Sequence, residues 1–109
     1  MMCGESSTET SMAKGYWVAF YKAVHDQEKL SAYARLAGPA IQAAGGKFLA
    51  RGTAAKAYEA GVVQRVVVVE FPSVAAATAC HDGEAYQEAL RVLGKGSVDR
   101  DLRVVEGVE

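Results

Sequence analysis

Two stretches decide the fold of this chain: Lys47-Phe48-Leu49-Ala50-Arg51-Gly52-Thr53 and Arg65-Val66-Val67-Val68-Val69-Glu70-Phe71-Pro72. Their β-branched and aromatic residues are typical of strands. A turn signal, Glu59-Ala60-Gly61-Val62, lies between them and predicts an antiparallel hairpin with Ala60 and Gly61 at its tip. In that register Arg51 lies opposite Glu70, on one face with Leu49, Val66 and Val68. The sequence therefore predicts a charge pair inside an apolar sheet.

This predicted pair has two interpretations. In the functional one, Arg51 holds a substrate carboxylate or enolate, and Glu70 orients the substrate or moves a proton. In the structural one, the two residues form a buried ion pair that specifies the strand register. A β-bulge between the strands would misalign the pair and weaken both interpretations.

Further elements are predicted on both sides of the hairpin. Before the hairpin we expect a strand over 15–23 and a helix that Asp26 caps and that ends near Ala44, before Gly45-Gly46. After the hairpin we expect a helix over 74–80 capped by Ser73 and a second helical piece over 84–93, separated by the break at Asp82-Gly83. The last predicted element is a strand over 101–108. The order strand, helix, strand, strand, helix, strand predicts an α+β fold. It is the ferredoxin-like βαββαβ pattern, a four-stranded antiparallel sheet with its helices on one face.

The predicted strands are apolar on both faces. Tyr16, Val18 and Phe20 alternate with Trp17 and Tyr21 in the first strand, and the valines of 66–69 occupy both faces of the third. A sheet with helices on one face only should instead alternate apolar with polar residues. We therefore expect a second copy of the chain to cover the other face, which makes the protein a homodimer.

Composition limits the classes of function. The chain has 109 residues, is half hydrophobic and carries a formal net charge of -1, so we expect one globular domain. No apolar run is long enough to span a membrane, and no basic stripe indicates a nucleic-acid partner. Residues 1–13 are polar and are expected to form a disordered tail, which leaves 14–109 as the domain.

The two cysteines predict a reduced, cytoplasmic protein. Cys3 lies in the predicted tail and Cys80 in a predicted helix, which makes a poor disulfide framework. We expect Cys80 to be packed as a small hydrophobic residue.

Four other side chains are candidates for a site. His25 lies where the first strand meets the first helix, and His81 lies at the break between the two later helical pieces. Each is either a general base in a cleft between sheet and helices or a solvated loop histidine. Trp17 and Tyr86 are the aromatic residues expected to contact a substrate, although aromatic residues in strands and helix stripes usually belong to the core. No pattern of metal ligands is present, and we expect no metal or other cofactor.

Five short motifs resemble a known family. They are Lys14-Gly15-Tyr16-Trp17-Val18-Ala19, Phe48-Leu49-Ala50-Arg51-Gly52, Val68-Val69-Glu70-Phe71-Pro72-Ser73, Glu84-Ala85-Tyr86-Gln87 and Val104-Val105-Glu106-Gly107-Val108. In this order and spacing, the chain from about Lys14 to Glu109 resembles domain-of-unknown-function family 1330, of the dimeric α/β-barrel superfamily. The resemblance implies a ferredoxin-like protomer whose sheet packs on that of its partner. One departure is visible: family members often have Tyr, then Asn or Asp, Ser and Pro before the Glu-Tyr-Gln run, whereas this chain has His81-Asp82-Gly83.

The resemblance does not specify a reaction, because the wider superfamily holds cofactor-free monooxygenases, haem-binding enzymes, lactone isomerases and polyketide cyclases. Three hypotheses remain open. The protein is a cofactor-independent enzyme that acts on a small enolisable or aromatic metabolite, with Arg51, Glu70 and His81 as catalytic residues and Trp17, Tyr86 and His25 as substrate-binding residues. Alternatively, it is a non-catalytic small-molecule-binding or stress-associated dimer. In the third hypothesis it is a structural or interaction module.

Overall fold

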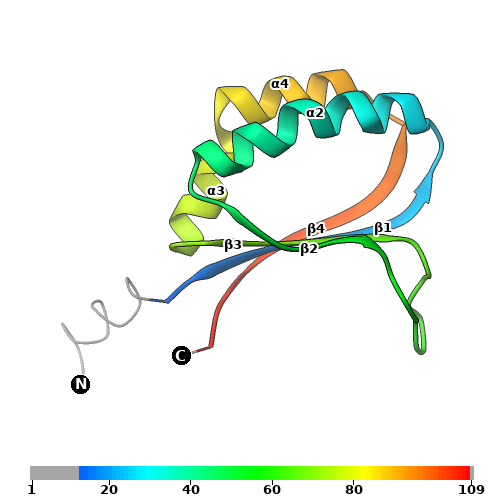
Figure 1. Ribbon diagram of the computed structural model, residues 1–109, viewed down its shortest axis with the longest axis horizontal. Helices are drawn as coiled ribbons and strands as arrows, with labels where there is room; N and C mark the ends of the chain where they lie inside the picture. The colour runs from blue at the N-terminus through cyan, green and yellow to red at the C-terminus, as the bar shows by residue number, and fades with distance from the viewer. Residues whose placement is uncertain (1–12, 109) are drawn as a thin grey trace.

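The computed structural model describes residues 13–108, and the predicted tail lies outside this range except for Ala13, which is buried. Its elements are β1 (Gly15–Val24), α2 (Gln27–Ala43), β2 (Lys47–Thr53), β3 (Arg65–Phe71), α3 (Val74–Asp82), α4 (Glu84–Leu93) and β4 (Val98–Glu106). The strands form one antiparallel sheet in the order β2-β3-β1-β4. All three helices lie on one side of this sheet (Figure 1). The predicted ferredoxin-like fold is therefore confirmed.

Local signals in the sequence set the ends of the helices. The Asp26 side chain accepts a hydrogen bond from the Lys29 backbone nitrogen at 3.0 Å, and the Ser73 hydroxyl accepts one from Ala76 at 3.0 Å. After α2 the chain turns at Gly45, whose φ of 96° lies in the left-handed region that glycine adopts without strain. Gly83 separates α3 from α4, as the sequence predicts.

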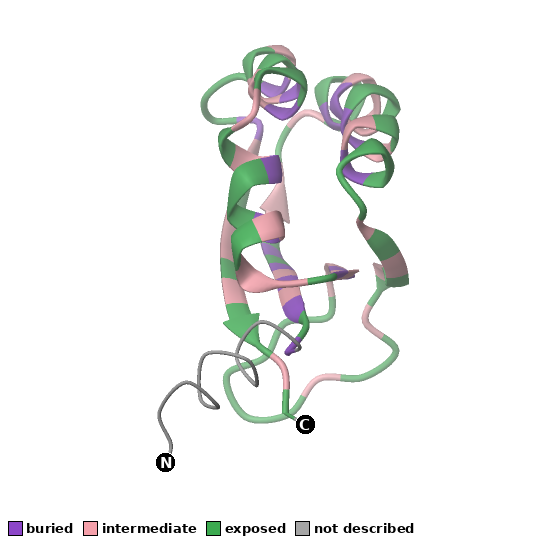
Figure 2. Cartoon of the chain, turned by 90° about the vertical axis from the view of Figure 1, so that its left-hand side faces the viewer, coloured by how far each residue is buried: buried purple, intermediate pink, exposed green. Residues whose placement is uncertain are grey.

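The core lies between the helices and the sheet, where the buried residues gather (Figure 2). Trp17, Ala19 and Tyr21 face the helices from β1, whereas Tyr16, Val18 and Phe20 face the other way. On β3 the helix face carries Val67, Val69 and Phe71. The predicted assignment of the β1 residues to two faces is confirmed, because strand side chains alternate strictly between them.

The predicted hairpin register is wrong. The two strands pair Arg51 with Val67 and Lys47 with Glu70, and the register shifts between Phe48 and Ala50. The strands are also shorter than a tight hairpin requires, since residues 54–64 form an irregular connection. Arg51 and Val67 share the helix face, whereas Glu70 lies on the open face beside Tyr16. Arg51 and Glu70 therefore lie on opposite faces of the sheet.

The last strand also differs from expectation, because it begins at Val98 and ends at Glu106 instead of running over 101–108. This earlier start places Arg100 in the sheet, directly opposite Tyr21 of β1.

Candidate functional site

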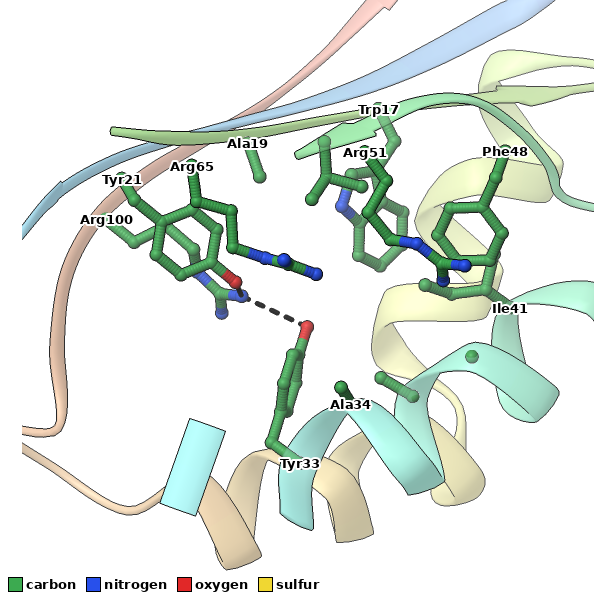
Figure 3. A pocket seen from close by; sticks show the side chains of 13 residues that line it. Trp17, Ala19, Tyr21, Tyr33, Ala34, Ile41, Phe48, Arg51, Arg65 and Arg100 are labelled. Atoms are coloured by element: carbon green, nitrogen blue, oxygen red, sulfur yellow. Dashed lines mark hydrogen bonds between the residues drawn. The ribbon is translucent and has the colours of Figure 1, made fainter. Parts of the chain in front are cut away.

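A pocket opens between the sheet and α2 (Figure 3). It encloses a volume of about 30 Å³ and is partly open to solvent. A ligand larger than a few atoms would therefore extend through the open side of the pocket. Residues of β1, α2 and all three other strands line it: Trp17, Ala19, Tyr21, Tyr33, Ala34, Ala37, Gly38, Ile41, Phe48, Arg51, Arg65, Val67 and Arg100.

Three arginines line this otherwise apolar and aromatic pocket. Arg51 comes from β2, Arg65 from the start of β3 and Arg100 from β4, and the strand pairing places each on the helix face. Among the described residues, none of the three forms an ion pair with a carboxylate, and the lining contains no Asp, Glu or His. Arg51 is exposed, but Arg65 and Arg100 are partly buried, and a partly buried positive charge without a counter-ion is costly, so the pocket favours an anionic ligand.

All three guanidinium groups lie over aromatic rings, and the Cζ atom of Arg100 lies 5.5 Å from the ring centroid of Tyr21 and 5.3 Å from that of Tyr33. The Cζ atom of Arg51 lies 4.4 Å from the ring centroid of Phe48, and that of Arg65 lies 5.8 Å from the ring centroid of Tyr21. Both distances are within the range of a cation–π interaction. The Nε atom of Arg65 is buried and has no hydrogen-bond partner among the described residues. A buried donor without an acceptor is destabilising, and a ligand oxygen would relieve that cost.

Arg100 organises two tyrosine hydroxyls at the edge of the pocket. One of its terminal nitrogens donates to Tyr33 Oη at 3.0 Å and to Tyr21 Oη at 3.2 Å. The Tyr33 hydroxyl is also hydrogen-bonded to the Tyr86 hydroxyl, at 2.5 Å. Figure 3 shows the Tyr33 ring rising from α2, with its hydroxyl directed at the space that Arg65 and Arg100 border.

Burial and neighbouring groups set the protonation states in this network. Burial, followed by the proximity of Tyr33, raises the pKa of Tyr86 above its usual range, so its hydroxyl stays protonated at neutral pH. Burial by itself would lower the pKa of Arg100, but its interactions with Tyr33, Tyr86 and Tyr21 outweigh this effect and raise it. Arg100 is therefore a permanent cation in the wall of the pocket.

The predicted site residues do not gather in one place. Arg51 and Trp17 line the pocket, and Tyr86 lies behind it, where its hydroxyl contacts Tyr33. The His81 ring lies 5.4 Å from the Tyr86 ring and 5.9 Å from that of Trp17, which places it near the pocket but outside its lining.

Glu70 and His25 lie elsewhere. Glu70 is on the open face of the sheet, where Tyr16 donates to its carboxylate at 3.4 Å and Lys14 lies 3.7 Å away. His25 is exposed and its Nε2 atom lies 3.0 Å from an oxygen of Asp99. The structure therefore does not bring Arg51, Glu70 and His81 together.

Sequence reasoning missed Tyr21, Tyr33, Arg65 and Arg100 as site residues. Arg65 begins a strand whose other helix-facing residues are apolar, and this pattern was a usable signal. Arg100 could not be found in this way, because the predicted strand began after it.

The described residues contain neither a metal-binding cluster nor a membrane-spanning helix. Within 13–108, no three side chains of the His, Cys, Asp and Glu types are placed to hold a metal ion. Over the same residues, none of the helices combines the length and apolar character needed to cross a membrane.

Comparison with known proteins places this geometry in a family. Among solved structures, the fold is similar to a protein of unknown function from Rhodopseudomonas palustris, with a TM-score of 0.70 and 19% identity over 100% of this chain and 96% of that one. It is also similar to a protein provisionally named an antibiotic biosynthesis monooxygenase from Caulobacter crescentus, with a TM-score of 0.59 and 15% identity over 96% and 99% of the two chains. At these identities the likeness concerns the fold alone. A search of curated proteins found no match. The family model for a domain of unknown function, DUF1330, matches residues 14–108, and the chain belongs to this family.

Proposed function

We propose that the protein binds a small organic anion with an aromatic or apolar body in the pocket between the sheet and α2. The observation that carries this proposal is the set of three arginines, Arg51, Arg65 and Arg100, which line the pocket without a described carboxylate partner. Their guanidinium groups match the geometry of a carboxylate. Trp17, Phe48 and Ile41 provide the apolar surface for the body of the ligand.

A fluorescence titration tests this proposal, because Trp17 is the only tryptophan of the chain and lines the pocket. We expect 3-phenylpropionate to change the emission of Trp17 and to bind more tightly than the neutral 3-phenylpropanamide. Arg65→Met should weaken binding of the acid by at least about tenfold, since a charge-assisted hydrogen bond is lost. Arg35→Met, on the exposed part of α2, is the matched control. Equal binding of acid and amide would contradict the proposal.

Cofactor-independent catalysis on an enolisable ligand is a second candidate for the same pocket. It is favoured by Arg100 and Tyr33, which together can stabilise negative charge on an enolate oxygen. The proton would leave the carbon for water at the open side of the pocket. Faster exchange of the C3 protons of phenylpyruvate for deuterium, followed by NMR, would support catalysis. An unchanged exchange rate in the presence of a bound ligand would leave binding as the function.

We further propose that a second copy of the chain covers the open face of the sheet. On this face Phe20 is 44% and Val105 is 54% exposed, next to the half-buried Tyr16, Val18, Val66 and Val68. An apolar surface of this kind is typical of an interface. The charges there include the Arg103–Asp101 pair, whose atoms lie 2.9 Å apart.

A further inference from the structure

The hydrogen-bond directions in the pocket restrict the ligand more narrowly than its charge does. A guanidinium group can only donate, so the oxygens of Tyr21 and Tyr33 both act as acceptors toward Arg100. Each hydroxyl then retains its own hydrogen for another partner.

The Tyr21 hydroxyl has no acceptor among the described residues. Its ring is 4% exposed and lines the pocket, and its recorded hydrogen bond is the one it accepts from Arg100. A buried donor without an acceptor costs free energy. The Tyr21 hydrogen is therefore available to a ligand.

The Tyr33 hydrogen is available for a related reason. Tyr86 is 1% exposed, and the one described hydrogen-bond partner of its hydroxyl is Tyr33. If Tyr33 donated to Tyr86, the hydrogen of Tyr86 would be buried without an acceptor. The arrangement that satisfies both groups has Tyr86 donating to Tyr33. The Tyr33 oxygen then accepts from Arg100 and Tyr86, and its hydrogen is directed toward the pocket.

The polar groups that the described lining presents to a ligand are therefore donors. They comprise the free nitrogens of the three arginines, including the unpartnered Nε of Arg65, and the hydroxyl hydrogens of Tyr21 and Tyr33. A ligand that matches them carries a carboxylate and a second acceptor oxygen. An ammonium group would be repelled by the arginines.

We infer that the ligand is a 2-oxo acid with an aromatic or branched apolar side chain. Its carboxylate binds the arginines, and its carbonyl oxygen accepts hydrogen bonds from Tyr21 and Tyr33. Arg100 and Tyr86 are positioning residues that orient these two hydroxyls. This inference rests on the proposed anion pocket and adds the class of ligand.

The test compares three acids with the same phenyl group: phenylpyruvate, 3-phenylpropionate, which lacks the carbonyl, and phenylalanine, which carries an ammonium group. With the full chain and Trp17 fluorescence as readout, we expect phenylpyruvate to bind most tightly and phenylalanine most weakly. Tyr21→Phe and Tyr33→Phe should each reduce the preference for phenylpyruvate over 3-phenylpropionate by about two- to tenfold, the value of one hydrogen bond. Binding of 3-phenylpropionate should change little.

Tyr16→Phe is the matched control, because its hydroxyl bonds Glu70 on the open face of the sheet. Tyr21→Phe keeps the test decisive if Tyr33→Phe, which removes the partner of Tyr86, fails to fold. A preference for phenylpyruvate that survives both substitutions would overturn the inference, as would equal binding of the two acids. Failure of both acids to bind would overturn the anion pocket, and the inference with it. The Tyr86→Phe variant should not bind phenylpyruvate more tightly than the original chain does. Tighter binding would show that Tyr33 donates its hydrogen to Tyr86 in the original chain, and this result would also overturn the inference.

Discussion

At the residue scale, the sheet separates two charges that the sequence alone had paired. Arg51 faces α2 and the pocket, with its guanidinium over the Phe48 ring, whereas Glu70 faces away from the helices and contacts Lys14 and Tyr16. The cross-strand partner of Arg51 is Val67, three positions from Glu70, a separation of about 10 Å along the strand. Removing the charge of Arg51 and removing that of Glu70 therefore affect different sets of contacts.

We predict that Arg51→Met and Glu70→Gln have additive effects on the free energy of unfolding. Residues that share no partner and lie this far apart usually add within about 0.5 kcal/mol. Urea unfolding of both single variants and the double variant measures this. A coupling well above that value would contradict the observed register. Ligand binding provides a second readout, because Arg51→Met should weaken binding of 3-phenylpropionate and Glu70→Gln should not.

At the element scale, the join between α2 and β2 has no free space. A Cβ atom on Gly46 would lie 2.5 Å from Cγ2 of Ile41 and 2.9 Å from Cζ of Phe71. Both neighbours are buried core residues. Gly46 therefore lies close to Ile41 near the end of α2 and to Phe71 at the end of β3, and α2 provides one wall of the pocket.

Gly46→Ala should therefore destabilise the protein by about 1–3 kcal/mol, the usual cost of forcing extra volume into a packed core. Gly52→Ala, within β2, is the control, because nothing lies within 4 Å of its added Cβ. That change should stay within about 0.5 kcal/mol of the original chain. Urea unfolding distinguishes the two. Similar costs for both substitutions would show that packing against Ile41 and Phe71 does not explain the glycine at position 46.

At the scale of the whole molecule, the open face of the sheet is the main unexplained surface. It lies on the side of the sheet opposite the helices (Figure 1). Phe20 and Val105 are exposed on it. The pocket between the sheet and α2 lies on the other face and is lined by residues of a single chain. Assembly through the open face would therefore leave the pocket intact.

We expect light scattering at micromolar concentration to report about twice the monomer mass, because the apolar face is then buried between two copies. Phe20→Lys should shift the mass toward that of the monomer, since a charge would be placed in an apolar interface. Leu36→Lys is the control, because Leu36 is 42% exposed on α2, away from this face. A stable monomer before any substitution would contradict the dimer.

The fold was predictable because its signals are local. Asp26 and Ser73 cap helices through bonds that reach three residues along the chain, and Gly45 turns the backbone at its own position. The candidate site was only partly predictable. Arg51 and Trp17 were identified and do line the pocket, but Arg65, Arg100 and Tyr33 reach it from three elements distant in sequence.

By itself, the sequence determined the order of the elements, the caps of the helices and the face of each residue in β1, because these depend on neighbours within one turn or on strict alternation. Only the tertiary structure decided the register of β2 against β3 and the convergence of the arginines and tyrosines. The pairs nearest the connection, Arg51 with Val67 and Thr53 with Arg65, already lie three positions away from the register that the turn signal predicts, and the irregularity between Phe48 and Ala50 adds one more. The register therefore depends on the irregular connection over 54–64 and on how the whole sheet packs against the helices, and this long-range balance has no local signature.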